Sequence, residues 1–596
     1  GELLLCDLSR DAGSLRAVEE QRQRSGVAVA LRYFGIGDRG GAPEPGSLRW
    51  LERSLESGGP LAVRAGPSSR LFEELTARQR TSLPVHRGEL LMRLHGTGCY
   101  TSQAAMKRWN RQNERLADAA ERAAMTAHWL GAMPYPRARL RQAWERFLWH
   151  QFHDDLTGTS VPAAYTYSWN DEVLTLNQFA AVLTAAVGAV ARGLDTRAEG
   201  EPVVVFNPLS WEREEVVAVN LPASVPGAPA AREPAFRVVG PDGDEVPSQV
   251  VTAPQGGLRL LFRGRAPSCG FAVYDLRKAA SPRTFASDLL GSPDRLENGR
   301  VRASFDRDGN LASLRESGLG RELLAGPVRF ELLANTSLRF PAWEIRWQDV
   351  SAPPREILGG PARIDVVENG PVRVALEVRR RAGDSEFIER WSLAHGEPLL
   401  RADCEIQWRT RGRLLKLAVR TALQRPRATY DLGLGTIERG VNSAELYEVP
   451  AQGWADLSAA DGECGLAIAS DCKQGWDRPE AATLRLTLLH TPKVGRRFRH
   501  QGRQDLGHHR LTVGLLPHAG DWQSADASRW SEAMAQPLRA FRVAAGSGPL
   551  GRSFSMLELT SGLPPGGTNS VVVRALKLAE DGDEAVVRLQ ELHGES

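Results

Sequence analysis

Cysteine and net charge are both scarce in this 596-residue chain, and each scarcity excludes classes of protein. The six cysteines are scattered without a Cys-x-x-Cys pair, which argues against a zinc knuckle and against a disulfide framework. Their pattern indicates a reduced compartment, so a cytoplasmic location is expected. A formal net charge of +3 gives no support for nucleic acid or an anionic membrane as a partner.

Long hydrophobic runs are also missing. The longest apolar run, residues 179–191, is shorter than the ~20 residues that a membrane-spanning helix needs, so no span is expected. No signal peptide is visible. The chain begins at Gly1 without Met, so we expect its natural N-terminus, with any targeting segment, to lie upstream. The length suits roughly three to five domains.

Residues 1–85 alternate between strand and helix patterns, which indicates an α/β domain. Strands are predicted at 2–6, 27–34 and 61–64, and the second is almost continuously apolar, as in a buried parallel sheet. Three parallel strands bury little surface and leave an open edge. We therefore expect this region to be the C-terminal portion of a larger parallel α/β domain.

Residues 86–195 predict a three-helix bundle. The apolar spacing places its helices at 102–130, 136–156 and 171–192. Thr101 or Ser102 is the expected N-cap of the first helix.

From about residue 201 the pattern changes to short β-rich segments divided by Pro, Gly and Asp. Many short strands without a long helix indicate β-sandwiches. We expect two or more sandwiches packed as one unit, a β-sandwich superdomain over 196–596, entered through a linker at 196–202. The predicted fold class is thus multidomain α/β + α + β.

The segment 150–160, HQFHDDLTGTS, places two histidines and two carboxylates at the expected end of the second helix. Asp154 and Asp155 would lie where the helix dipole is negative, which disfavours carboxylates. A cation or polar ligand would offset this, so the segment predicts a metal or sugar site around His153 and Asp154. In the alternative interpretation, His153 is a partner of the helix dipole and both aspartates are solvated.

Asp38 is a second candidate, because it follows the predicted strand 27–34 within a glycine-rich segment, 35–41. Ligands of α/β sheets bind beyond the C-terminal ends of the strands. A turn in which Asp38 caps its own backbone explains the pattern equally well.

Other polar and aromatic residues favour structural roles. The pair His508-His509 lies in a β context, where a satisfied or exposed structural pair is expected. Trp454 and Trp476 could stack on sugar rings, but core packing is the first expectation. His95 could line a pocket or pack in the core.

Several segments together carry a family resemblance. Residues 151–154 with 157–160 form one motif, and Gly35-Ile36-Gly37-Asp38 forms another. These resemble the helix-end motif and the glycine-rich catalytic loop of glycoside hydrolase family 38, the zinc-dependent α-mannosidases. Further segments resemble the family in the same order: GEL at 88–90, YTS at 100–102, KR at 107–108, VFNPLSW at 205–211, GTIER at 435–439, VPAQ at 449–452, WAD at 454–456 and LPH at 516–518.

The resemblance implies that His153 is a zinc ligand, that Asp154 hydrogen-bonds sugar hydroxyls and that Asp38 is the general acid/base. It implies retaining hydrolysis of α-mannosides, with zinc as cofactor and a mannose-containing glycoside as partner. The family's other zinc ligands and its nucleophile are expected upstream of Gly1, since residues 1–85 contain no His-x-Asp. Arg39 would lower the pKa of Asp38, which suits a base better than an acid. Family members often assemble, so a homo-oligomer is possible.

Two hypotheses follow. In the first, the chain is the C-terminal portion of an α-mannosidase and is inactive without its upstream part. In the alternative, it is a non-catalytic carbohydrate-binding or interaction module with the same fold. A sandwich lectin with an incidental helical arm would leave His153, Asp154 and Asp38 unexplained.

Overall fold

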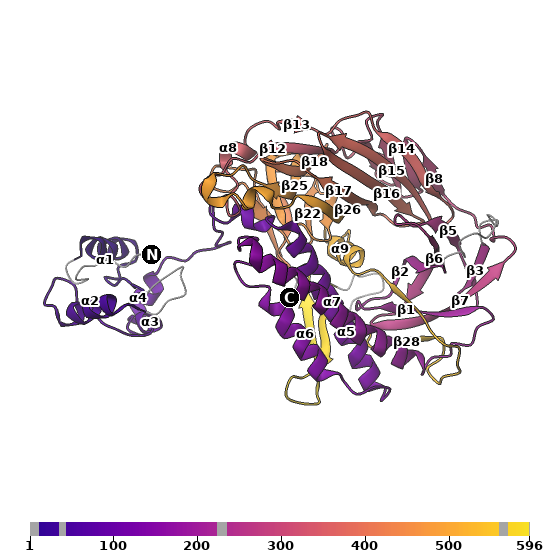
Figure 1. Ribbon diagram of the computed structural model, residues 1–596, viewed down its shortest axis with the longest axis horizontal. Helices are drawn as coiled ribbons and strands as arrows, with labels where there is room; N and C mark the ends of the chain where they lie inside the picture. Colours follow the sequence, from indigo (N-terminus) through magenta and orange to yellow (C-terminus); the bar gives the residue numbers. More distant parts are fainter. Residues whose placement is uncertain (1–10, 35–42, 223–234, 560–569, 595–596) are drawn as a thin grey trace. The chain divides into compact units, whose positions relative to one another are not determined.

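The computed structural model describes residues 11–34, 43–222, 235–559 and 570–594. The chain divides into two compact units, Gly1–Leu91 and Met92–Ser596. Helices make up the described elements of the first unit, whereas a helix bundle and antiparallel sheets make up the second (Figure 1). The expected combination of helical and large β-rich regions is confirmed.

The first unit has four helices among its described residues: α1 Ala12–Ser25, α2 Pro45–Glu56, α3 Arg70–Glu73 and α4 Ala77–Ser82. Two of them begin at locally encoded caps. The Asp11 carboxylate accepts a hydrogen bond from the Ser14 backbone N–H at 2.6 Å, and Thr76 forms a capping box with Gln79. These contacts satisfy N–H groups of the first helical turn.

The predicted strands differ from the structure in this unit. No strand is assigned over 11–34 and 43–91, and the apolar segment 27–34 exposes Leu31 and Tyr33. A parallel strand is stable only when neighbouring strands satisfy its backbone groups and bury its side chains, and the described part of this unit provides none. The predicted strand 2–6 and the candidate Asp38 lie outside the described residues.

The helix bundle opens the second unit, after the short helix η1 Thr97–Tyr100, with α5 Ala104–Trp129, α6 Arg137–Trp149 and α7 Pro162–Ala191 (Figure 1). Its core joins alanines of α5, such as Ala120 and Ala124, to Phe179, Leu183 and Val187 of α7. Small residues on one helix let large ones on the other interdigitate without voids. The three predicted helices are all present, but α6 ends earlier and α7 begins earlier than predicted.

The predicted N-cap of α5 is wrong. Gln103 occupies the N-cap position and makes no side-chain capping bond. Ser102 instead donates its hydroxyl hydrogen to the Ala342 carbonyl oxygen at 2.6 Å, so its side chain bonds to the β region and not to the start of the helix.

Helix α7 is 30 residues long, and by length and composition it could cross a membrane. The apolar run in the sequence underestimates it, because the helix already begins at Pro162. Phe179, Leu183, Ala186 and Val190 recur at helical spacing and belong to the buried core of the bundle. This packing accounts for the apolar residues on the buried face of α7.

The first β layers pack against the bundle. Strand β1 (Glu201–Asn207) is an inner strand of its sheet and is buried on both faces: Val204 and Phe206 join the helix core, while Val203 and Val205 join a second core with the facing sheet. This alternation follows from the two-residue period of a strand. The sheet order is β27-β1-β7-β3-β4 with β28 beside β7, and the facing sheet is β2-β6-β5. Their bounds are β2 Arg213–Asn220, β3 Ala235–Val239, β4 Glu245–Val246, β5 Ser248–Thr252, β6 Leu258–Ala266, β7 Gly270–Ala279, β27 Arg539–Arg542 and β28 Ser553–Ser555.

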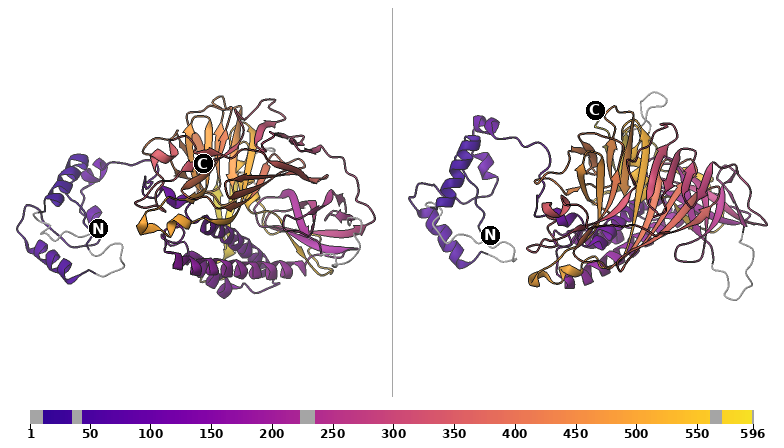
Figure 2. Two further views of the ribbon diagram at one scale, coloured as in Figure 1. Left: turned by 45° about the horizontal axis from the view of Figure 1, so that its top comes forward. Right: turned by 90° about the horizontal axis from the view of Figure 1, so that it is seen from above.

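Two larger antiparallel sheets form the main sandwich (Figure 2). Phe330 of one sheet meets Phe387 of the other with ring centroids 5.6 Å apart, and the Trp408 indole N–H donates to Thr491 Oγ1 at 2.9 Å. The nine-stranded sheet contains β14 Arg363–Asn369, β15 Arg373–Ala382, β16 Ser385–Ala394, β17 Leu400–Trp408, β26 Gly507–Ala519, β23 Cys464–Ser470, β22 Trp454–Ser458, β19 Ala428–Asp431 and β20 Thr436–Arg439. The six-stranded sheet contains β13 Glu356–Ile357, β12 Arg329–Ala334, β18 Arg413–Arg420, β25 Thr483–Thr491, β24 Gly475–Glu480 and β21 Val449–Pro450.

Smaller elements complete this region. The remaining strands form a four-stranded sheet, β8 Leu289–Ser292, β9 Arg295–Asn298, β10 Val301–Phe305 and β11 Leu311–Glu316, and a hairpin, β29 Val571–Leu578 and β30 Ala585–Glu591. The hairpin packs Val573 and Leu576 against Met125 of α5. Helical pieces after residue 201 are short within the described chain, as predicted: α8 Trp347–Val350, η2 Arg496–Phe498, η3 Gln501–Arg503 and α9 Ala527–Ala535.

Candidate functional site

The candidate segment 150–160 is a series of turns that follows α6, and not its last helical turn. Helix α6 ends at Trp149, and His150 is its C-cap. The Asp154 carbonyl oxygen then accepts hydrogen bonds from the backbone N–H groups of Thr159 and Ser160, at 3.1 and 2.9 Å. Asp154 lies beyond the last turn of α6, so the helix dipole does not disfavour its carboxylate and that prediction is wrong.

A buried pair anchors these turns. His150 Nδ1 lies 2.6 Å from Asp155 Oδ2, and Ser168 of α7 donates to both oxygens of that carboxylate. His150 Nε2 lies 3.2 Å from Asp171 Oδ2. Burial opposes protonation of His150, but the hydrogen bonds to Asp155 and Asp171 outweigh it and raise the pKa of the imidazole. His150 and Asp155, two of the four His and Asp residues in this segment, thus have a structural role.

Gly158 lets the turns approach the start of the bundle. Its φ of 85° is left-handed, and a Cβ at this position would lie 2.2 Å from the Ser102 carbonyl oxygen. The buried Lys107 ammonium donates to that same oxygen and, at 2.7 Å, to the Leu156 carbonyl oxygen. Burial lowers the pKa of Lys107 to about 8. Glycine and lysine together hold the two segments side by side.

His153 and Asp154 are left on the surface of this scaffold. Their side chains are 77% and 47% exposed, with Nε2 and Oδ2 3.8 Å apart. The Phe152 ring packs on the imidazole, with centroids 4.1 Å apart, and Asp154 Oδ1 accepts a hydrogen bond from the Thr159 hydroxyl at 3.1 Å. The arrangement presents one imidazole and one carboxylate to a ligand.

These two side chains do not complete a metal site. No group of three His, Cys, Asp or Glu side chains converges on one point in the described part of the chain, whereas zinc in proteins takes at least three protein ligands. The predicted acid/base Asp38 lies outside the described residues.

Four apolar side chains near the pair in sequence are more than half exposed. Leu148 and Trp149 precede the segment, Phe152 lies within it and Val161 follows it.

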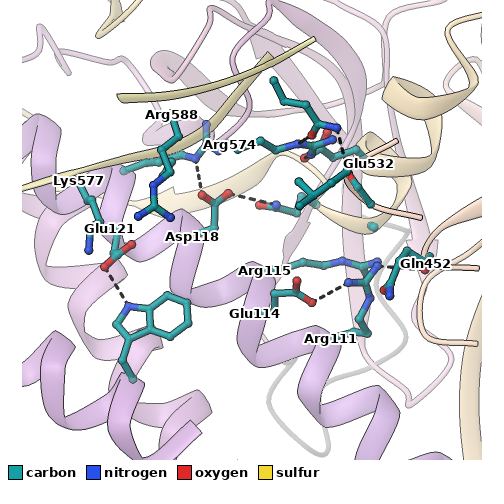
Figure 3. A pocket seen from close by; sticks show the side chains of 18 of the residues that line it. Arg111, Glu114, Arg115, Asp118, Glu121, Gln452, Glu532, Arg574, Lys577 and Arg588 are labelled. Atoms are coloured by element: carbon teal, nitrogen blue, oxygen red, sulfur yellow. Dashed lines mark hydrogen bonds and ion pairs between the residues drawn. The ribbon is translucent and has the colours of Figure 1, made fainter. Parts of the chain in front are cut away.

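A polar pocket of about 980 Å³ lies further along α5, between the bundle and the β29–β30 hairpin (Figure 3). Most of its charges are paired. Arg111 meets Glu114 at 2.7 Å, and Arg574 meets Glu532 at 2.8 Å. Glu121 accepts a hydrogen bond from the Trp144 indole at 2.9 Å, and burial raises its pKa to about 7. The internal pairing indicates an interface between layers of the fold.

The residues set aside on sequence grounds have structural positions. Trp454 and Trp476 are buried, as core packing predicts. His509 is buried with Nε2 2.7 Å from the Asp505 carbonyl oxygen, while His508 is exposed. His95 packs edge-on against Phe340, with ring centroids 4.9 Å apart.

Comparison with known proteins covers both main regions. Residues 94–188 match the model of the alpha mannosidase middle domain, and residues 296–495 match that of the glycosyl hydrolases family 38 C-terminal domain. The chain is 27% identical to alpha-mannosidase 2C1 of Homo sapiens over 597 residues, covering 97% of this chain and 52% of that protein. It is 24% identical to alpha-mannosidase G of Dictyostelium discoideum, covering 95% and 53%.

Solved structures agree on the fold. An alpha-mannosidase from Enterococcus faecalis V583 superposes with a TM-score of 0.75 at 16% identity, covering 92% of this chain and 69% of the other. A family 38 protein from Enterococcus faecalis gives 0.76 at 17%, covering 98% and 73%. The chain spans about half the length of the curated relatives that it matches.

Proposed function

Because this chain belongs to family 38 of the glycosyl hydrolases, we propose that it forms the middle and C-terminal parts of an α-mannosidase. The reaction is retaining hydrolysis of terminal α-mannosides. The observation that carries the proposal is a difference in burial within segment 150–160. His150 and Asp155 are buried and paired, whereas the side chains of His153 and Asp154 are exposed. A scaffold that holds two polar groups outward is suited to a ligand.

His153 would be one zinc ligand, because neutral imidazole binds zinc well. Asp154 would accept hydrogen bonds from sugar hydroxyls, and Asp38 would serve as general acid/base. The metal would orient the sugar and polarise its oxygens when bound. Since the described residues alone do not make a zinc site, no catalytic step is assigned to it.

Retaining hydrolysis requires two carboxylates near the scissile bond. Among the described residues, the segment presents Asp154 alone beside His153. We therefore propose that turnover depends on residues other than those described and on the part of the family fold that this chain does not span.

Five free cysteines among the described residues support a reduced, cytoplasmic location.

Zinc content and hydrolysis of an aryl α-mannoside test the proposal, on this chain and on a version extended upstream where the gene encodes one. We expect zinc and activity in the extended form, and loss of both with His153→Ala. Retention of both by that variant would contradict the ligand assignment. Folded protein without zinc or activity in either form would favour a carbohydrate-binding module.

A further inference from the structure

A second pocket of the larger unit, of about 1740 Å³, opens beside the candidate segment. It is bounded by the starts of α5 and α7 and by the segment between β25 and β26. Ser160 and Tyr165 line it, and the Tyr165 hydroxyl donates to the Asp154 carbonyl oxygen at 3.3 Å. The pocket therefore begins directly next to the turn that holds Asp154.

The charge of this pocket is one-sided. Its lining includes seven Lys or Arg side chains and a single carboxylate, Asp505. Four of the cations come from the segment between β25 and β26: Lys493, Arg496, Arg499 and Arg503. The whole chain, by comparison, contains 75 basic and 72 acidic residues. A ratio of seven to one is thus a local concentration of positive charge.

The remaining three cations lie at or just before the starts of strands: Arg355 precedes β13, Arg411 precedes β18, and Arg413 is the first residue of β18. None of the seven forms an ion pair with a carboxylate in the part of the chain that the structure describes, in contrast to exposed arginines elsewhere such as Arg363 and Arg381.

Asp505 offsets at most one of the seven positive charges in the pocket lining. Its two carboxylate oxygens accept hydrogen bonds from the backbone N–H groups of Ala104 and His490, at 2.7 and 3.2 Å. Each oxygen of this carboxylate therefore already accepts a backbone hydrogen bond. Unpaired like charges gathered in one concavity raise the local potential and attract an anion.

Aromatic side chains supply a second kind of contact. Trp109 and Trp169 both line the pocket, with ring centroids 5.8 Å apart at 71°. Trp169 is 42% exposed. A tryptophan face next to polar groups packs well on the C–H face of a sugar ring. Cations and aromatics together suit a ligand that is both anionic and saccharide.

We propose that this pocket binds the phosphate group of a phosphorylated α-mannoside, with the sugar ring against Trp169. The inference rests on the proposed function for the mannoside part. Arginine and lysine suit a phosphate because they form charge-assisted hydrogen bonds with several of its oxygens. The pocket would thereby select charged over neutral mannosides.

Calorimetric titration of this chain with mannose 6-phosphate, galactose 6-phosphate and inorganic phosphate tests the inference. The variant is Arg496→Gln/Arg499→Gln, and the matched control is Arg363→Gln/Arg381→Gln, which removes two exposed charges outside the pocket. We expect mannose 6-phosphate to bind most tightly. The pocket variant should lose about 10- to 100-fold in affinity for it, and the control should match the wild type.

Equal affinity of wild type and pocket variant for mannose 6-phosphate would overturn the inference. Equal affinity for all three ligands would overturn its mannoside part. The proposed function is judged separately, by hydrolysis of a neutral aryl α-mannoside. If the protein hydrolyses the aryl mannoside but does not bind mannose 6-phosphate, only the inference about the pocket is contradicted. If it binds mannose 6-phosphate through these arginines but does not hydrolyse the aryl mannoside, only the proposed catalysis is contradicted.

Discussion

The Asp505 carboxylate caps helix α5 from 401 residues away, by accepting a hydrogen bond from the Ala104 backbone N–H at 2.7 Å. Ala104 is the first residue of α5, and Gln103 before it provides no side-chain cap. The other carboxylate oxygen accepts from the His490 N–H at the end of β25. One side chain thus ties the helix bundle to the large sandwich.

Asp505→Asn is expected to remove a pH dependence of stability. Burial raises the pKa of Asp505 to about 6, above its value in the unfolded chain. Between pH 4 and 6 the folded state therefore binds more protons than the unfolded state, so the free energy of unfolding falls as pH rises. The stability of the wild type relative to the variant should fall by about 2 kcal/mol across this range, measured by urea denaturation at each pH.

Asp583→Asn, which removes an exposed carboxylate, is the control for the loss of one acidic side chain. Parallel profiles for wild type and Asp505→Asn would show that the buried carboxylate does not titrate in this range.

Gly158→Ala should destabilise the larger unit by about 3 kcal/mol or more. The substitution forces a side chain into a left-handed conformation and places Cβ 2.2 Å from the Ser102 carbonyl oxygen. Gly188→Ala in α7 is the matched control, because its Cβ would meet nothing within 4 Å. That change should raise stability by about 1 kcal/mol through helix propensity. Thermal unfolding of both variants gives the comparison, and a neutral Gly158→Ala would contradict the close approach.

Local patterns predicted the parts of this fold that depend on local sequence. The apolar spacing of α5 fixes its extent to within two residues at its start and one at its end. Its cap was not predictable, because the capping group is Asp505 from the far end of the chain. The end of α6 depends on the buried pair His150 and Asp155, which is completed by Ser168 of α7.

The candidate site shows the same limit. Sequence singled out the segment 150–160 and proposed His153 and Asp154, and both side chains are accessible to a ligand. Periodicity did not reveal that the neighbouring His and Asp are buried, nor that Lys107 links the turns to α5. The strand prediction at 27–34 had no described partner strand to support it, because parallel pairing depends on residues distant in sequence.

Lys416→Met should strongly destabilise the main sandwich. The Lys416 ammonium is fully buried and lies 2.6 Å from Glu448 and 3.0 Å from Asp477, while donating to Thr487 Oγ1 at 2.7 Å. Its removal leaves buried carboxylate charge unpaired, at a cost of about 3–5 kcal/mol. Chemical denaturation of the single variant measures this cost.

The double variant Lys416→Met/Glu448→Gln removes both charges and should recover at least half of the lost stability. Arg381→Met breaks an exposed pair with Glu386, and should change stability by less than about 1 kcal/mol. A single variant as mild as the Arg381 control would contradict the inferred dependence of the core on this ammonium.

His150→Ala and His153→Ala should separate the structural from the ligand-facing half of the candidate segment. Loss of the His150 imidazole leaves the buried Asp155 carboxylate with Ser168 as its side-chain donor, and should cost about 3 kcal/mol. Because the pKa of His150 is raised in the folded state, its stabilising charge is present below the unfolded pKa and is lost as pH rises through the folded value. The destabilisation should therefore be larger at pH 6 than at pH 9.

His153 is mostly exposed, so its replacement should change stability by less than about 0.5 kcal/mol. Denaturation at the two pH values measures the stability of both variants. A large stability loss for His153→Ala would show that this histidine is also structural. A loss of zinc in that variant could then no longer be assigned to a missing ligand.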